Sequence, residues 1–175
     1  MSYQLQRFSL ESVHLTLQDW QTAVQDDDLF ALEYQDLFKW TESHIQYEDK
    51  HLESYAYGIF TKDSPNTAAH AIVDIIQRPH GRRQTKLLKL VVSPQFADDT
   101  DVNNLNTLVD LMLAAVLGTV EISGRNSSST IKIYGRTNAM LGVLRKLNDT
   151  ITNSPTFTKS ITTKIAGRWL EISLT

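Results

Sequence analysis

The chain has no cysteine among its 175 residues. It therefore has no disulfide, no thiol nucleophile and no thiolate ligand for zinc or an iron–sulfur cluster. This composition is compatible with a reducing compartment, and we expect a cytoplasmic protein. The histidines also lack the His-x-His or His-Glu-x-x-His spacing of a metal site, so no metal is expected.

An excess of positive charge is lacking as well. Lys and Arg number 17 against 20 Asp and Glu, a formal net charge of −3. We therefore expect no nucleic-acid partner, and this charge disfavours a nucleic-acid adaptor that would use the basic turn near residues 78–86. The longest apolar run, residues 111–117, is far shorter than the roughly 20 residues of a membrane span. The first residues contain no apolar stretch of signal-peptide length, so we expect no membrane association.

The hydrophobic pattern predicts a mixture of strands and helices in one domain over residues 1–175. Strands are predicted at residues 12–17, 53–61, 68–77, 84–92, 130–136, 159–164 and 168–174. Helices are predicted at residues 19–47, 102–122 and 138–147, with a break in the first near the Asp triplet at 26–28. The helix at 102–122 is apolar almost all round and is expected to be deeply buried. This order predicts an α+β, or mixed α/β, fold with a mostly antiparallel central sheet flanked by helices.

Two segments within this order carry a resemblance to a known family. The strand at 84–92 ends in a hydrophobic pair and is followed by Pro94 and Phe96, and the strand at 130–136 leads into a helix that begins at Asn138. Together with the order of elements, these features resemble the GNAT superfamily of N-acyltransferases over nearly the whole chain. The resemblance implies a single GNAT-like domain that transfers an acyl group from acetyl-CoA, or another acyl-CoA, directly to an amine.

The resemblance also implies a set of cofactor-binding positions. The end of the fourth strand would bind the pantetheine arm and polarise the thioester carbonyl through a backbone N–H. The loop and helix start that follow would receive the pyrophosphate. By family position these residues are Leu90, Val91, Val92, Thr100, Asp101, Val102 and Asn138.

The loop at residues 97–102 departs from the family pattern of a Gln or Arg followed by small residues. Thr100 and Val102 stand at the two small positions, and aspartates occupy positions 98, 99 and 101. A carboxylate about 6 Å from a phosphate costs roughly 2–3 kcal/mol at an effective dielectric near 20, which opposes pyrophosphate binding. The family's usual Tyr acid is also absent, because its position falls on Leu144 or Arg145.

His70 and Asp74 are the candidates for a general base. They are four residues apart on a predicted strand, so without a bulge they share one face and could take a proton from an amine. The alternative for the pair is a hydrogen-bonded or exposed structural role. His14, on the predicted strand at 12–17, is a weaker candidate of the same kind.

Two functions remain open at this point. The first is an acyl-CoA-dependent N-acyltransferase, divergent or of reduced activity, whose partner is a small-molecule or protein amine. The alternative is a non-catalytic GNAT-like module that has lost CoA binding and takes a protein partner. A homodimer is compatible with either. An enzyme should have an opening between the fourth and fifth strands that reaches Val91, whereas a module should have it filled, for instance by Phe96 or Tyr134.

Overall fold

We describe the protein from a computed structural model. It describes residues 2–46, 53–62, 64, 67–78, 83–96, 102–125, 127–153 and 161–174. The strands are β1 (Tyr3–Arg7), β2 (Ser54–Thr61), β3 (Ala71–Arg78), β4 (Gln84–Val92), β5 (Thr130–Tyr134), β6 (Ile161–Ala166) and β7 (Trp169–Leu174). The helices are α1 (Leu10–Val24), α2 (Asp27–Ser43), α3 (Val102–Arg125) and α4 (Asn138–Thr152), with a 3-10 turn, η1, at Pro94–Phe96.

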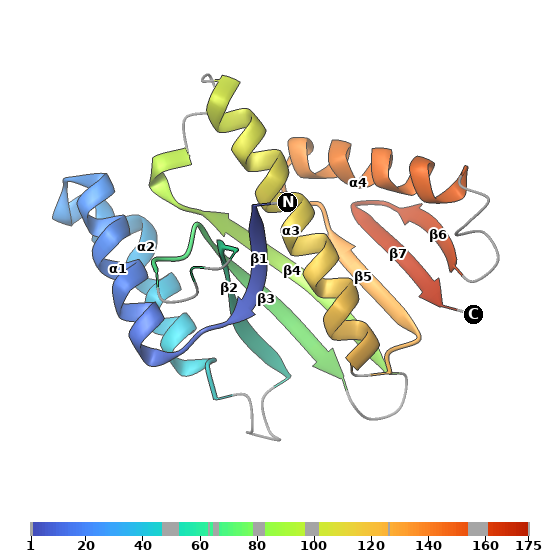
Figure 1. Cartoon of the computed structure of the whole chain (residues 1–175), viewed down its shortest axis with the longest axis horizontal. Coiled ribbons are helices and arrows are strands. Elements are labelled where there is room, and N and C mark those ends of the chain that lie inside the picture. The colour runs from blue at the N-terminus through green and yellow to red at the C-terminus, as the bar shows by residue number, and fades with distance from the viewer. Residues whose placement is uncertain are drawn as a thin grey trace.

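The seven strands form one sheet in the order β1-β2-β3-β4-β5-β7-β6 (Figure 1). All neighbours are antiparallel except β4 and β5, which are parallel. The parallel pair is possible because the long helix α3 connects the two strands. The predicted α+β fold with a mostly antiparallel sheet is therefore confirmed.

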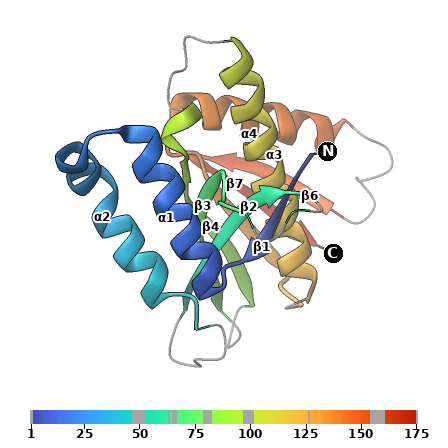
Figure 2. The same ribbon diagram turned by 60° about the vertical axis from the view of Figure 1, so that its left-hand side comes forward.

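Helices cover the sheet as two separate layers. Helices α1 and α2 pack through Trp20, Phe30 and Phe38 on one face, against a cluster that includes Ile72 of β3. Helices α3 and α4 pack on the opposite face, over a core that includes Leu111. Figure 2 shows the two layers on either side of the sheet.

The first part of the chain differs from the sequence prediction. Residues 12–17 lie in helix α1, not in a strand, and the first strand is β1. Ser9 caps α1 together with Ser12, in a reciprocal capping box, so Asp19 does not begin a helix. The prediction was wrong because the same segment also has a helical spacing: Val13, Thr16 and Trp20 are three and four residues apart, and these are the residues that α1 buries.

Two features of the backbone follow from the residue types present. The Asp26 side chain accepts a hydrogen bond from the Leu29 N–H at 2.9 Å and caps α2, at the predicted break near the Asp triplet. The hairpin between β6 and β7 turns at Gly167, whose φ of +62° is a conformation that favours glycine.

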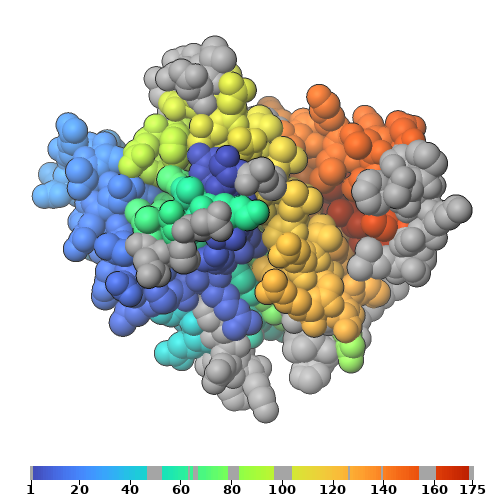
Figure 3. All heavy atoms as spheres, in the orientation of Figure 1, coloured from blue at the N-terminus to red at the C-terminus, as the bar shows by residue number. Residues whose placement is uncertain are grey.

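Helix α3 is less buried than its composition predicts. Its inner side is fully covered, with Leu111 and Ala115 at 0% exposure, but Leu117 is 51% exposed and Leu105 43%. Figure 3 shows α3, in yellow, crossing the surface of this face. By length and composition alone the segment Asn104–Arg125 could cross a membrane, whereas here it packs against the sheet.

Candidate functional site

Strands β4 and β5 separate partway along their length. Their parallel pairing runs from Gln84 opposite Thr130 to Leu87 opposite Ile133 and then ends. Strand β4 continues for five more residues, Leu88 to Val92, still paired with β3 on its other side. The N–H and C=O groups of this segment that point toward β5 therefore have no β5 partner, which leaves them available to a ligand.

A β-bulge accompanies the separation. Asp74 pairs with Lys89 and Ile75 pairs with Leu87, so Leu88 is an extra residue on β4. A bulge bends its strand and increases the local twist, which directs the rest of β4 away from β5. It also reverses the alternation, because Leu87 faces the α3 side before the bulge and Leu90 faces it afterwards.

The predicted donor-binding residues of β4 lie on this separated segment. Leu90 and Val92 are partly buried against the α3 core, whereas Val91 packs toward α1 and α2. Phe96 and Tyr134, the side chains that could fill the opening, each contact another aromatic ring. The Phe96 ring lies 5.8 Å from the His70 ring and the Tyr134 ring lies 4.9 Å from Trp169.

The remaining predicted positions are only partly described. Thr100 and Asp101 lie outside the described residues, as do the other residues of the acidic loop. Val102 is the first residue of α3. Asn138 is the first residue of α4, after the N-cap Thr137, and its Oδ1 accepts a hydrogen bond from Arg168 at 3.4 Å. Asn138 thus lies at the helix start where the resemblance puts it.

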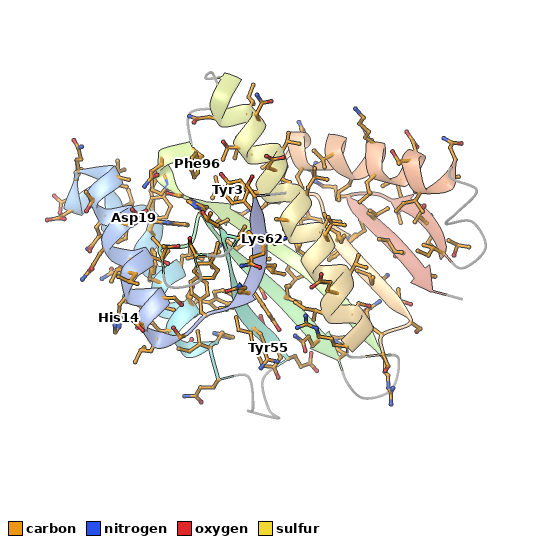
Figure 4. The ribbon with its side chains drawn as sticks, viewed as in Figure 1. Tyr3, His14, Asp19, Tyr55, Lys62 and Phe96 are labelled. Atoms are coloured by element: carbon orange, nitrogen blue, oxygen red, sulfur yellow. The ribbon has the colours of Figure 1, made fainter. Side chains whose placement is uncertain are left out.

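His70 lies just before β3, at the end of the sheet where η1 follows β4. Its Nε2 is hydrogen bonded to the Thr61 hydroxyl at 2.9 Å, and its ring lies edge-on to Tyr3 at 5.2 Å. Figure 4 shows Tyr3 and Phe96 together at this end, with Asp19 on α1 to one side. Burial lowers the pKa of His70, against a smaller raising effect from Asp19, which favours the neutral imidazole.

The Asp74 side chain is on the face of the sheet that α1 and α2 cover. It lies two residues after Ile72 on β3, and residues two apart on a strand share a face. It accepts a hydrogen bond of 2.5 Å from the Ser54 hydroxyl. Burial raises the pKa of the Asp74 carboxyl, against the Ser54 hydrogen bond and the charges of His44 and Lys89. A carboxyl with a raised pKa is better matched to proton transfer near neutral pH than an ordinary aspartate.

The structure does not bring His70 and Asp74 together as one unit. Four residues along a strand separate their backbones by about 13 Å. Their hydrogen-bond partners also differ, Thr61 for His70 and Ser54 for Asp74. The expectation of a shared face was wrong because His70 precedes β3 and does not continue its alternation. Of the two, Asp74 lies beside the bulge, where β4 leaves β5.

His14, the weaker candidate, lies on α1 and makes an exposed contact of 3.7 Å to Glu42 of α2. Figure 4 shows it away from Tyr3 and Phe96. A hollow of about 390 Å³ lies nearby between α1 and α2, lined by residues that include Leu17, Phe30 and Gln35. Neither His14 nor this hollow adjoins the separated part of β4.

The segment that carries His70 is held by α1. The Thr16 hydroxyl accepts a hydrogen bond from the Ala69 N–H at 2.9 Å, and Trp20 Nε1 donates to the Ala69 carbonyl at 3.0 Å. Thr16 and Trp20 are one helical turn apart, so the two side chains point to the same backbone unit. The backbone carbonyl of His70 accepts a hydrogen bond from the Ser93 N–H at 2.8 Å, which connects the start of β3 to the end of β4.

Sequence reasoning did not single out three residues around the opening: Ser54, Lys89 and Arg136. Lys89 pairs with Asp74 across β3 and β4, and Ser54 approaches the same carboxylate from β2. Lys89 lies within an apolar run of β4, and the sequence of that run does not predict the bulge that sets which way Lys89 points. A signal for Arg136 was present, because it follows the motif that leads into Asn138.

Comparisons with known proteins agree with this architecture. The aminoglycoside 6′-acetyltransferase type Ii is 13% identical, covers 98% of this chain and 97% of its own, and superposes with a TM-score of 0.52. An acetyltransferase from Streptococcus agalactiae 2603 is 8% identical, over 100% and 99% of the chains, with a TM-score of 0.43. A GNAT-family acetyltransferase from Staphylococcus aureus Mu50 is 11% identical, over 99% and 100%, with a TM-score of 0.41.

These identities bear on the fold alone. No family model matches the sequence, and no curated protein matches it. The superposition with the aminoglycoside 6′-acetyltransferase shows that the chain has the GNAT acetyltransferase fold, as the sequence resemblance implied. Its activity has to be argued from its own residues.

Proposed function

We propose that this protein is an acyl-CoA-dependent N-acyltransferase. The observation that carries the proposal is the early end of the β4–β5 ladder, after Leu87 and Ile133, beside a bulge at Leu88. An extended pantetheine arm can add to such an edge as a further strand would, by hydrogen bonding to unpaired backbone groups. Acetyl-CoA or a longer acyl-CoA fits the proposal equally.

The reaction needs no covalent enzyme intermediate, which agrees with the absence of cysteine. The amine nitrogen attacks the thioester carbonyl carbon, a C–N bond forms and the C–S bond breaks. The amine loses one proton to a base and the departing CoA thiolate gains one, so the products are an amide and free CoA. A backbone N–H of the Leu88–Val92 segment would donate to the carbonyl oxygen as negative charge develops on it.

Asp74 is our preferred general base. Its carboxyl pairs across the strands with Lys89, next to the bulge, and burial raises its pKa. The Ser54 hydroxyl donates to one carboxylate oxygen, Oδ1, and leaves Oδ2 able to accept a proton. His70 is the second candidate, but its Nε2 is already hydrogen bonded to the Thr61 hydroxyl, and it lies near the end of β4 next to Phe96, away from the bulge.

One feature of the sequence favours a second candidate function, a non-catalytic binding module. The aspartates at 98, 99 and 101 lie where the donor pyrophosphate would dock by family position. Three carboxylates at a phosphate site oppose binding by several kcal/mol before screening. A protein partner would then use the same fold without CoA.

Calorimetry distinguishes the two functions. Acetyl-CoA and CoA are titrated at moderate salt into the wild type and into a variant with Asn at the three loop aspartates. The control variant carries the same change at three exposed aspartates of α2: Asp27, Asp28 and Asp36. Micromolar binding by the wild type supports the enzyme. Binding by the loop variant alone supports a module whose donor site is closed by charge, and binding by neither contradicts a CoA-dependent function.

A further inference from the structure

Part of the sheet has a face that no described helix covers. The buried residues of β5 and β7, such as Ile133 and Leu170, point toward α3 and α4. Their neighbours along each strand point the other way, while α1 and α2 pack over β2 and β3. We call this surface the open face. It presents Lys86, Lys89, Lys132, Tyr134, Lys164, Trp169 and Glu171.

A row of lysines crosses the open face in register. Lys86 pairs with Lys132, Lys132 pairs with Glu171, and Glu171 pairs with Lys164. Glu171 accepts from both of its lysine neighbours, at 2.5 Å from Lys132 and 3.1 Å from Lys164. The Glu171 carboxylate thus forms ion pairs with two lysines. Lys86 lies beside Lys132 and forms no ion pair with any described residue. Like charges directly opposite each other are unfavourable in a sheet, so an anion beside Lys86 and Lys132 would relieve their repulsion.

Two further cations lie at the opening between β4 and β5. Lys89 follows the bulge on β4 and faces the same side as Val91, toward the open face. The parallel ladder ends where Leu87 pairs with Ile133, so Lys89 and Arg136, two and three residues further along, both follow the point where the strands separate. Burial, and to a smaller extent the positive charge of Arg136, lower the pKa of Lys89. The charge of Asp74, which pairs with Lys89 across β3 and β4, opposes this effect, so the described residues around the two cations supply one carboxylate for two positive charges.

The backbone that carries Arg136 is held in place from the β6–β7 hairpin. The Arg168 guanidinium donates to the carbonyls of Gly135 and Arg136, at 2.7 and 2.8 Å. Beside it the rings of Tyr134 and Trp169 lie directly opposite each other in register and 4.9 Å apart. An arginine whose backbone is held beside an aromatic pair is suited to a small ligand that has an anionic group on a compact body.

We infer that the acceptor of this protein is an amine that carries an anionic group, a carboxylate or a phosphate, and that this anion lies between Lys89 and Arg136 on the open face. The inference rests on the proposed acyl transfer and gives its substrate class. The resemblance implies that the donor phosphates would lie at the start of α3, which would leave these cations to the acceptor. Asp74 lies on the same face as Lys89, which puts the preferred base on the acceptor's side of the sheet.

The test uses two matched pairs of amines with acetyl-CoA as donor and free thiol release as the readout. Glycine is compared with glycinamide, and phosphoethanolamine with ethanolamine, so that the carboxylate and the phosphate are tested separately. The wild type should favour at least one anionic amine by roughly 10- to 100-fold in kcat/KM, as expected for a charge-assisted contact. In Arg136→Gln and in Lys89→Gln this preference should fall through a higher KM for the anionic amine. Lys146→Gln, an exposed lysine on α4, should keep it.

Donor binding is measured separately by calorimetry on the same proteins, and their thermal unfolding shows that they are folded. If acetyl-CoA binds and neutral amines react as well as anionic ones, or neither anionic amine reacts, the inference is overturned while the donor half of the proposed function stands. If acetyl-CoA does not bind, the proposed function fails first. A preference that survives in both Arg136→Gln and Lys89→Gln also overturns the assignment of the anion to these cations.

Discussion

Replacing Thr16 by valine removes the partner of one buried backbone N–H. Thr16 is fully buried, and its hydroxyl oxygen accepts the Ala69 N–H at 2.9 Å while donating to the Ser12 carbonyl at 2.6 Å. Valine has nearly the same volume, so the change creates no cavity of consequence. The Ala69 N–H would be left in the core without an acceptor.

The cost can be bounded from that single group. An orphaned buried donor costs about 1–3 kcal/mol of unfolding free energy, whereas the Ser12 carbonyl has its own place in the helical ladder and loses little. For a protein of this size each kcal/mol lowers Tm by roughly 2–4 °C. We expect urea unfolding, followed by circular dichroism, to show that Thr16→Val lowers the unfolding free energy by about 1–3 kcal/mol with an unchanged m-value.

Thr119→Val is the matched control. Thr119 is also fully buried and its hydroxyl also donates to the carbonyl four residues back, Ala115, at 2.7 Å. No described N–H donates to it, so valine should change stability by less than about 0.5 kcal/mol. Equal losses in the two variants would refute the reasoning, because the Ala69 N–H would then not be what Thr16 stabilises.

Three further predictions use other contacts of the structure. Gly118→Ala should lower the Tm in thermal unfolding, because a Cβ there would lie 2.3 Å from the Leu5 side chain of β1. Gly142 has open space around it, so Gly142→Ala should raise the unfolding free energy by about 0.5–1 kcal/mol. Asp74→Asn should flatten the pH dependence of the unfolding free energy. The pKa of the Asp74 carboxyl is raised in the folded protein, so the unfolding free energy of the wild type falls as pH rises from about 4 toward that pKa. An Asn variant whose unfolding free energy changes with pH as steeply as that of the wild type would contradict this. Glu171→Gln should cost about 1–2 kcal/mol in urea unfolding, because Lys132, only 28% exposed, loses its carboxylate partner, and a neutral result would contradict it.

The sequence was sufficient for the order of elements and for much of the central sheet. Strand β4 has the predicted bounds, Gln84–Val92, because its apolar run is closed by Ser93 and Pro94. The strand predicted at residues 12–17 was wrong because this short segment fits both the two-residue period of a strand and the 3.6-residue period of a helix. The signals that would have corrected it were the alternation in β1 and the capping residue Ser9.

The candidate site was less predictable, because it depends on register. The bulge at Leu88 is not readable in a run where apolar residues occupy both faces, yet it decides that Lys89 faces Asp74. Likewise, Lys86 and Glu171 are 85 positions apart in the chain and reach one row only through strand pairing. The fold resemblance assigns donor binding to Leu90 to Val92 and Asn138, which stays a prediction, and it says nothing about the charge of the open face.

The central claim is that the separated segment of β4 binds the acyl donor. A titration of acetyl-CoA into ¹⁵N-labelled protein, followed through backbone amide shifts, tests it residue by residue. We predict saturable shifts at Leu88 to Val92, and none of comparable size at the β6–β7 hairpin around Gly167. Saturable binding that leaves the amides of Leu88 to Val92 unmoved, or no binding at millimolar acetyl-CoA, would contradict the account.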